Sequence, residues 1–248
     1  MKLHINYADG GFYESQKINS ESALSLGGIN KSISCSRGDL DHQFVARNAH
    51  VLSLKRGAGY WLWKPYLIDK YLRLISENDY LIYTDSGLLF VESIDDLIEL
   101  EKDSLNTDGV LLTETTQWIP SGPPWKAPLE FEWTKRDAFV LTETDVPEIT
   151  HTVQANAAFM VFQPRDKAFS FLSEWLKWGS DLRAITDMAN CKGKSNYDGF
   201  NEHRHDQSLM SILGKKFGFR IVGDMTQWGE PRRDHKYKTL FNHHRRKD

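Results

Sequence analysis

The sequence predicts an α/β fold in which a mostly parallel central sheet is flanked by helices. Short apolar runs, typical of buried strands, alternate along the chain with longer segments that have helical spacing of apolar residues. No repeat, low-complexity linker or break in composition divides the 248 residues. We therefore expect a single domain over residues 1–248.

The N-terminal part is predicted to begin with a strand that ends in a turn. Leu3, Ile5 and Tyr7 alternate with polar residues, and an Asp-Gly-Gly sequence then breaks the run. Helical spacing or an apolar run predicts four further elements, which are helices at 20–26, 41–54 and 61–75 and a strand at 80–84. The last two are the clearest elements of the chain.

The same alternation continues from residue 93 onward. The predicted elements are a helix at 93–102, strands at 109–113, 157–162 and 220–222, and helices at 133–141, 167–184 and 206–217. Residues 118–128 are rich in Pro, Gly and Trp, so we expect an irregular loop there. An irregular, basic tail is expected after the last strand.

Composition excludes several classes of protein. The net charge of -3 disfavours a dedicated nucleic-acid binder, so no nucleic-acid partner is expected. Two cysteines, Cys35 and Cys191, do not make a disulfide framework and favour a reducing compartment. The chain lacks a signal-peptide pattern and any apolar run of about 18 residues, so we expect a cytoplasmic protein.

The most informative segment covers residues 56–90. Its predicted strand ends at Asp85, which is followed at once by Ser86 and Gly87. Ligands of open α/β sheets bind outside the carboxyl ends of the strands. An acid at this place, with a small residue and a glycine behind it, suits a metal ion that bridges a phosphate ligand. The alternative is an aspartate that only begins a turn.

These residues resemble a known family. Residues 83–87, Tyr-Thr-Asp-Ser-Gly, are similar to the Asp-x-Asp metal motif of GT-A glycosyltransferases, and the preceding GYWLWKPYLI helix looks like that of bacterial and viral polysaccharide glycosyltransferases. Later segments follow in the family's order: an Asn-Ala strand at 156–162, a His-Asp-Gln helix start at 205–207, and a C-terminal His-His-Arg at 243–245. The resemblance spans nearly the whole chain and implies a GT-A-like, Rossmann-like fold.

The resemblance implies transfer of a sugar from a nucleotide-diphosphate sugar, favouring a UDP-sugar, to a saccharide acceptor in surface polysaccharide synthesis. A divalent metal held by a carboxylate neutralises the diphosphate as a Lewis acid. Oxygen and imidazole ligands suit Mn²⁺ or Mg²⁺. Gly87 replaces the second acid of the family motif, so either Asp85 holds the metal with waters and a distant histidine, or the metal binds weakly.

Several basic and polar residues match the family's donor site. Lys64, on the helix before the strand, is expected to reach a phosphate or a sugar hydroxyl; the alternative is a solvated lysine. Tyr7, Ala8 and Asp9 end the first strand where the family grips the base and ribose. An aspartate there can accept from ribose hydroxyls and a tyrosine can stack on the base, unless the segment is a simple turn.

The downstream motifs complete the expected donor site. The resemblance assigns Asp206 and Gln207 to the donor sugar near its anomeric carbon, although Asp206 as a simple helix cap is the alternative. Asn156 is expected to add a hydrogen bond to the sugar. In the tail, His243 or His244 would complete the metal site and Arg245 would contact the diphosphate. The alternatives are a solvated terminus or weak contact with anionic lipids at the inner face of the membrane.

Two rival functions stay open. A sugar nucleotidyltransferase would want a Gly-rich, basic loop after the first strand, and residues 9–12, Asp-Gly-Gly-Phe, lack the basic residue. A nucleotide-sugar or carbohydrate-binding protein without turnover is made plausible by Gly87.

Tryptophans 118, 125 and 133 are expected on the acceptor side, where flat aromatic faces pack on sugar rings.

Overall fold

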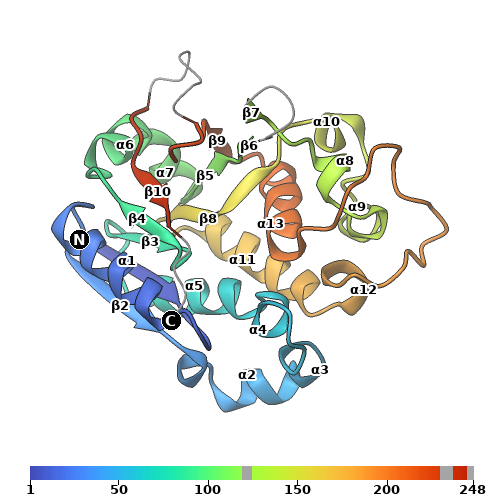
Figure 1. The fold of residues 1–248 in the computed structure, drawn as a ribbon, viewed down its shortest axis with the longest axis horizontal. Helices are drawn as coiled ribbons and strands as arrows, with labels where there is room; N and C mark the ends of the chain where they lie inside the picture. Colours follow the sequence, from blue (N-terminus) through green and yellow to red (C-terminus); the bar gives the residue numbers. More distant parts are fainter. Residues whose placement is uncertain (119–124, 230–236, 245–248) are drawn as a thin grey trace.

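A six-stranded sheet forms the centre of the molecule in the computed structural model, which describes residues 1–118, 125–229 and 237–244 (Figure 1). In spatial order its strands are β2 (Lys31–Cys35), β1 (Lys2–Tyr7), β3 (Tyr80–Thr84), β8 (Ala155–Phe162), β5 (Val110–Glu114) and β9 (Arg220–Val222). Strand β8 is antiparallel to both of its neighbours, and the other pairs are parallel. The predicted mostly parallel α/β sheet is confirmed.

Alternating residues of these strands belong to two hydrophobic cores, one on each face of the sheet. Leu81 and Tyr83 belong to the first core and Ile82 to the second. The first face packs against helices α5 (Trp63–Leu72), α11 (Asp166–Gly179) and α13 (His205–Lys216). The second packs against α1 (Tyr13–Ser25), α6 (Asp95–Leu100), α7 (Lys102–Asp108) and the C-terminal strand β10 (Phe241–His243).

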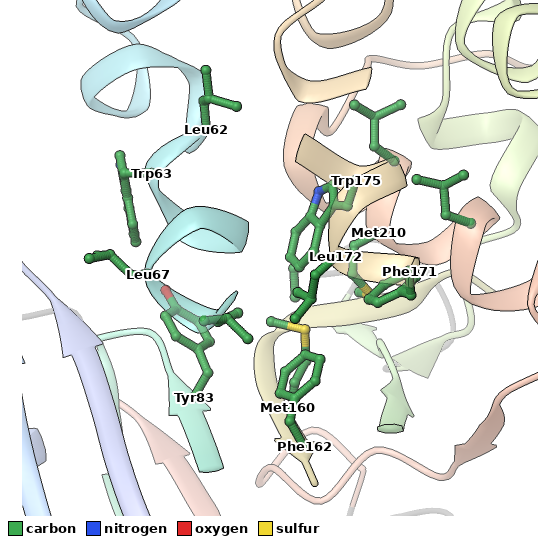
Figure 2. Close-up of a cluster of buried hydrophobic side chains, with 14 of the residues drawn as sticks. Leu62, Trp63, Leu67, Tyr83, Met160, Phe162, Phe171, Leu172, Trp175 and Met210 are labelled. Atoms are coloured by element: carbon green, nitrogen blue, oxygen red, sulfur yellow. The ribbon is translucent and has the colours of Figure 1, made fainter. Parts of the chain in front are cut away.

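Large side chains join helix α11 to the sheet on the first face (Figure 2). Phe171, Leu172 and Trp175 project from α11 toward Met160 and Phe162 of β8. All five are almost completely buried. Burial of such a side chain stabilises the fold by roughly 1.5–3 kcal/mol. This contact therefore fixes on the sheet the helix α11, against which α5 and α13, the helices that carry the candidate site, both pack.

Shorter elements surround this frame. The helices are η1 (Arg37–Asp39), α2 (His42–Arg47), α3 (Ala49–Leu52), α4 (Gly57–Tyr60), α8 (Glu130–Trp133), α9 (Arg136–Thr142), α10 (Pro147–Thr150) and α12 (Leu182–Ile185). Strand β4 (Leu88–Phe90) pairs with β10, and β6 (Gln117–Trp118) pairs with β7 (Trp125–Lys126). The expected irregular loop at 118–128 is therefore wrong at residue 118 and at residues 125–126, and its residues 119–124 lie outside the described ranges.

Three helix predictions need correction. Helix α1 begins at Tyr13 and not at residue 20. Its first half shows no apolar spacing because its buried face is polar: Gln16 and Asn19 donate hydrogen bonds to the carbonyls of Cys35 in β2 and Leu88 in β4. The segment 41–54 forms two short helices. The segment 167–184 divides into α11 and α12 because Asp181 starts α12, its side chain accepting a hydrogen bond from the Arg183 amide at 2.9 Å.

Five strands of the described residues were not predicted, namely β2, β4, β6, β7 and β10, and two of them show why. Strand β2 lies at the edge of the sheet and only Cys35 of its five residues is buried, so it lacks the apolar run of a buried strand. Strand β10 was expected to be irregular tail, but Phe241 is completely buried and packs against Phe90 and Phe159, with ring centroids 4.8 and 4.5 Å apart. This anchor brings the C-terminal segment back to the sheet.

Candidate functional site

Asp85 lies just beyond the carboxyl end of β3, as expected from the sequence. Its amide donates to the Ala158 carbonyl of the neighbouring strand β8 at 2.8 Å, which fixes the backbone. Its side chain is 42% exposed, while that of Ser86 is buried. The hydroxyl of Tyr83 donates to Asp85 Oδ1 at 2.6 Å, and this hydrogen bond orients the half-exposed carboxylate.

Lys64 is buried and pairs with two acids, so the alternative of a solvated lysine is wrong. Its Nζ atom lies 2.6 Å from Asp206 Oδ2 and 3.2 Å from Asp85 Oδ1, with only 2% of the side chain exposed. The same ammonium donates to the Ala157 carbonyl at 3.2 Å. A buried lysine with three oxygen partners is a fixed cation, and it joins helix α5 to β3, β8 and α13.

Burial and mutual attraction shift the pKa values of this cluster in different ways. Burial raises the pKa of Asp206 to about 6, although Lys64 opposes the shift. For Lys64, burial lowers the pKa, but the attraction of Asp206 and Asp85 is larger, so its pKa is raised and the ammonium stays charged at neutral pH. The pKa of the Tyr83 hydroxyl is raised well above its ordinary value by burial and by Asp85.

A bulge in β8 organises the residues around this cluster. Asn156 is opposite Thr113 of β5, yet the next pair along joins Met160 to Leu112, so extra residues of β8 stand out of the ladder. Among them is Ala157, whose carbonyl accepts from Lys64 and whose amide donates to Gln207 Oε1 at 3.3 Å. Bulges of this kind re-aim groups beside functional sites.

Asp206 and Gln207 lie in the first turn of α13, at the same place as Lys64. Asn156 is 7% exposed, and its Oδ1 accepts from the Ala158 amide at 2.8 Å, which folds the side chain over the bulge. The structure therefore brings Lys64, Asp85, Asn156, Asp206 and Gln207 together. Their assigned roles toward a donor sugar stay predictions.

A second network lies behind Gln207. Its Nε2 donates to Gln154 Oε1 at 2.7 Å, and Gln154 Nε2 donates to Glu130 Oε2 at 3.1 Å. Glu130 is completely buried and pairs through Oε1 with Lys215 at 2.6 Å. Sequence reasoning missed Gln154, which comes from a loop and shows no motif. It considered Glu130 only as one of four scattered carboxylates, with Glu114, Glu132 and Asp145, of which an inverting enzyme would need one as general base, and nothing in the sequence singled it out.

The backbone before α5 is strained. All of residues 57–61 have positive φ, including Ala58 at 51° and Trp61 at 59°, so the turn is left-handed. His205, just before Asp206, also has a positive φ, of 49°, and its ring stacks on Trp61 at a centroid distance of 5.7 Å. Such strain costs roughly 1–2 kcal/mol per residue other than glycine and clusters at functional sites. Here it precedes both Lys64 and Asp206.

Tyr7, Ala8 and Asp9 lie at the carboxyl end of β1, beside β3. The Tyr7 ring stacks on Trp63, with centroids 3.8 Å apart and planes at 18°, and Tyr7 is only 6% exposed. One face of the ring that was expected to stack on a base is thus covered by protein. Ala8 is buried and Asp9 is exposed.

The C-terminal histidines return to the loop that follows Asp85. His243 is opposite Leu88 in the β10–β4 ladder, and the His244 amide donates to the Gly87 carbonyl at 3.0 Å. The chain therefore brings both residues beside the position where the second acid of the motif was expected. Arg245 lies outside the described residues.

Asp85 offers one free carboxylate oxygen to a divalent metal. Lys64 and Tyr83 both contact Asp85 Oδ1, so the other carboxylate oxygen of this half-exposed side chain is the one offered to an added ion. Across residues 1–118, 125–229 and 237–244, no three His, Cys, Asp or Glu side chains form a metal-binding group. Mg²⁺-type sites are often built from one or two carboxylates plus substrate phosphates and waters. The residues present fit a site of that open kind.

No helix in the described part of the chain is long and apolar enough to cross a membrane.

The role of Tyr83 could have been inferred from the sequence. Tyr83 stands two residues before Asp85, on the same face of an extended segment, where a hydroxyl can orient the acid.

No model of a known protein family matches this chain, and no curated protein matches its sequence. Among solved structures, the crystal structure of mouse xyloside xylosyltransferase 1 in its apo form is similar to it. The match covers 98% of this chain and 97% of that chain, with a TM-score of 0.51 and 10% sequence identity. At this identity the similarity concerns the fold alone. It confirms the glycosyltransferase type of α/β fold that the sequence predicts.

Proposed function

We propose that this chain is a glycosyltransferase that transfers a sugar from a nucleotide-diphosphate sugar, a UDP-sugar by preference, to a saccharide acceptor in surface polysaccharide synthesis. One observation carries the proposal: a buried lysine bridges two acids, Asp85 and Asp206, at the carboxyl end of a central strand. Ligand sites of such sheets lie at that edge. A glycosyltransferase fold supports the same reaction class by analogy only.

Lys64 and Asp85 would serve the diphosphate. The Lys64 ammonium is charged and held without solvent, so its attraction for a phosphate oxygen is stronger than that of a surface lysine. Asp85, oriented by Tyr83, would hold Mn²⁺ or Mg²⁺ together with His243 or His244. When bound, the metal would neutralise the charge that develops on the leaving diphosphate. Arg245 would contribute to the same neutralisation.

Asp206, Gln207 and Asn156 would hold the donor sugar. Asp206 ionises near pH 6 because it is buried, and as a carboxylate it accepts hydrogen bonds from sugar hydroxyls. Gln207 is only partly buried, and its amide bonds to Ala157 and Gln154. The base and ribose would lie over Tyr7, Ala8 and Asp9, with Ser86 lining the path between them and the diphosphate.

The tail would cover the bound donor, because His244 is already hydrogen-bonded to Gly87. Closure of a segment over a site excludes water, which otherwise competes with the acceptor. We also propose that the basic end of this tail makes weak contact with anionic lipids, where a polysaccharide acceptor would be presented.

A carbohydrate- or nucleotide-sugar-binding protein without turnover is the second candidate. The observation that favours it is that no three-ligand metal group forms within the described ranges, together with Gly87 in place of an acid. Such a protein would bind the donor through Lys64 and Asp206 yet would leave the glycosidic bond intact.

The two candidates separate in one experiment. A panel of nucleotide-sugars is incubated with the protein and Mn²⁺, with and without simple glycosides as acceptors, and release of nucleoside diphosphate is measured. We expect release from one donor class, and we expect Asp85→Asn to lower the rate by about 100-fold or more, the size of a lost transition-state contact. Asp108→Asn, which removes a carboxylate from a surface pair with Lys167, is the matched control. Binding without release would favour the second candidate.

A further inference from the structure

Gln207 ends a chain of hydrogen bonds that has a fixed direction. At one end Glu130 is a buried carboxylate, which can only accept. Gln154 Nε2 donates to Glu130 Oε2 at 3.1 Å and to Thr134 Oγ1 at 3.2 Å, so both of its N–H groups are used. Its Oε1 must then accept, and it does so from Gln207 Nε2 at 2.7 Å.

The other end of the chain demands the same direction. The backbone amide of Ala157 can only donate, and it donates to Gln207 Oε1 at 3.3 Å. Reversal of either glutamine amide would place two donors face to face at Ala157 or two acceptors face to face at Glu130. Because both ends are fixed, the orientation of the Gln207 amide is determined by the protein before any ligand binds.

The carboxylate that sets the direction is itself firmly held. Lys215 Nζ lies 2.6 Å from Glu130 Oε1, and it also donates to the Val153 carbonyl at 2.7 Å. Ser211 donates to the same Glu130 oxygen. Each of these contacts satisfies a group that burial would otherwise leave without a partner. The network therefore connects the middle and the last turn of helix α13, through Ser211 and Lys215, with its first turn, where Gln207 is found.

The fixed amide leaves one N–H of Nε2 and one lone pair of Oε1 for a ligand. A donor and an acceptor side by side match two adjacent hydroxyl groups of a sugar, one accepting and the other donating. We propose that Gln154, anchored by Glu130, is a positioning residue that orients Gln207 to bind a pair of adjacent hydroxyls on the donor sugar. This inference rests on the proposed function, and it names the feature of the donor sugar that the site recognises.

A binding experiment separates this role from a purely structural one. Dissociation constants for UDP and for a panel of UDP-sugars are measured by calorimetry with Mn²⁺ present. Gln154→Leu is expected to weaken the best UDP-sugar by about 10-fold, the value of one or two misplaced hydrogen bonds. Affinity for UDP, which has no sugar to contact Gln207, is expected to stay within about twofold. Gln154→Met is a second variant in case the first folds poorly.

Gln163→Leu is the matched control. Gln163 and Gln154 flank the two ends of β8, and both are buried, with exposed fractions of 1% and 0%. The control should leave the affinities for UDP and for UDP-sugar unchanged relative to each other.

A double-mutant cycle gives the decisive readout. If Gln154 acts through Gln207, the variant Gln154→Leu/Gln207→Met binds the UDP-sugar no more weakly than Gln207→Met alone. The inference is overturned if the double variant loses affinity by the product of the two single-variant factors, or if Gln154→Leu weakens UDP and UDP-sugar equally. Either result leaves the proposed function intact. Wild-type protein that binds no UDP-sugar better than UDP overturns the role of the sugar site itself, and the inference with it.

Discussion

The Nζ atom of Lys64 lies 2.6 Å from a carboxylate oxygen of Asp206, and both side chains are buried. Helix α5 carries the cation and helix α13 carries the acid, so the pair joins two distant parts of the sequence at the edge of the sheet. Asp85 lies on the other side of the cation at 3.2 Å. One lysine therefore balances two acids, and its removal leaves them facing each other.

Lys64→Met is expected to lower both stability and donor binding. Loss of one partner of a buried ion pair costs about 3–5 kcal/mol, because a charge is left without compensation. Urea unfolding measures this change. The double variant Lys64→Met/Asp206→Leu should regain most of the stability, yet it should not regain affinity for UDP-sugar. Lys70→Met, which removes a more exposed lysine of α5 that pairs with Asp41, should leave both properties near wild type.

The activity is expected to rise with pH around the pKa of Asp206, which burial raises to about 6 from an ordinary 3.8. Stability should move the opposite way. The folded state holds this proton more tightly than the unfolded chain, so this group's contribution to the free energy of unfolding falls as the pH rises from about 4 to 6. The fall is about 3 kcal/mol.

The difference in urea stability between wild type and Asp206→Asn, measured at several pH values, isolates that contribution. Other carboxylates cancel in the difference as long as their own environment is unchanged. A difference that stays flat between pH 4 and 6 would show that Asp206 does not titrate in this range.

His244→Ala is expected to weaken the dependence on Mn²⁺. The backbone amide of His244 donates to the carbonyl of Gly87, so His244 lies beside the position where the family motif has its second acidic ligand. We expect the Mn²⁺ concentration for half-maximal donor binding to rise by roughly 10-fold, in line with the loss of one ligand or its supporting shell. His151→Ala removes an exposed imidazole far along the chain and serves as the control. An unchanged Mn²⁺ dependence in His244→Ala, with a change in His243→Ala, would assign the ligand to His243.

Ala58→Gly is expected to stabilise the protein. Ala58 has a φ of 51° within the left-handed turn, a conformation that costs an alanine roughly 1 kcal/mol more than a glycine. The gain should appear as an increase of about 1 kcal/mol in the free energy of unfolding. Ala23→Gly, inside the right-handed helix α1, should have the opposite sign. A loss of stability in Ala58→Gly would mean that the methyl group contributes more through packing than it costs in strain.

The sequence predicted the sheet where its strands are apolar and buried, such as β3 and β8. The prediction was wrong where the buried side chains are polar, as in α1, whose inner face forms hydrogen bonds through Gln16 and Asn19. It also missed the edge strand β2, which has few buried residues. The tail strand β10 depends on one distant contact, Phe241 against the second core, which no local pattern reveals. The single-domain organisation stays a prediction.

For the site, the end of a buried strand led to Asp85, and similarity to a known family led to Lys64 and Asp206. Their ion pairs could not be predicted, because they depend on where α5 and α13, which both pack against α11, place their side chains, and on the bulge that exposes the Ala157 carbonyl. Gln154 and Glu130 carry no motif at all. They became visible only as partners of Gln207 in space.

A crystal structure with UDP and Mn²⁺, with anomalous data collected to locate the metal, tests the donor site most directly. We expect an Mn²⁺ peak at roughly 2.0–2.3 Å from a carboxylate oxygen of Asp85. We also expect a diphosphate oxygen within hydrogen-bond distance of Lys64 Nζ, where it replaces Asp85 Oδ1, because the three N–H groups of the ammonium already have three partners. UDP bound at a different edge of the sheet, without contact to Asp85 or Lys64, would contradict the account.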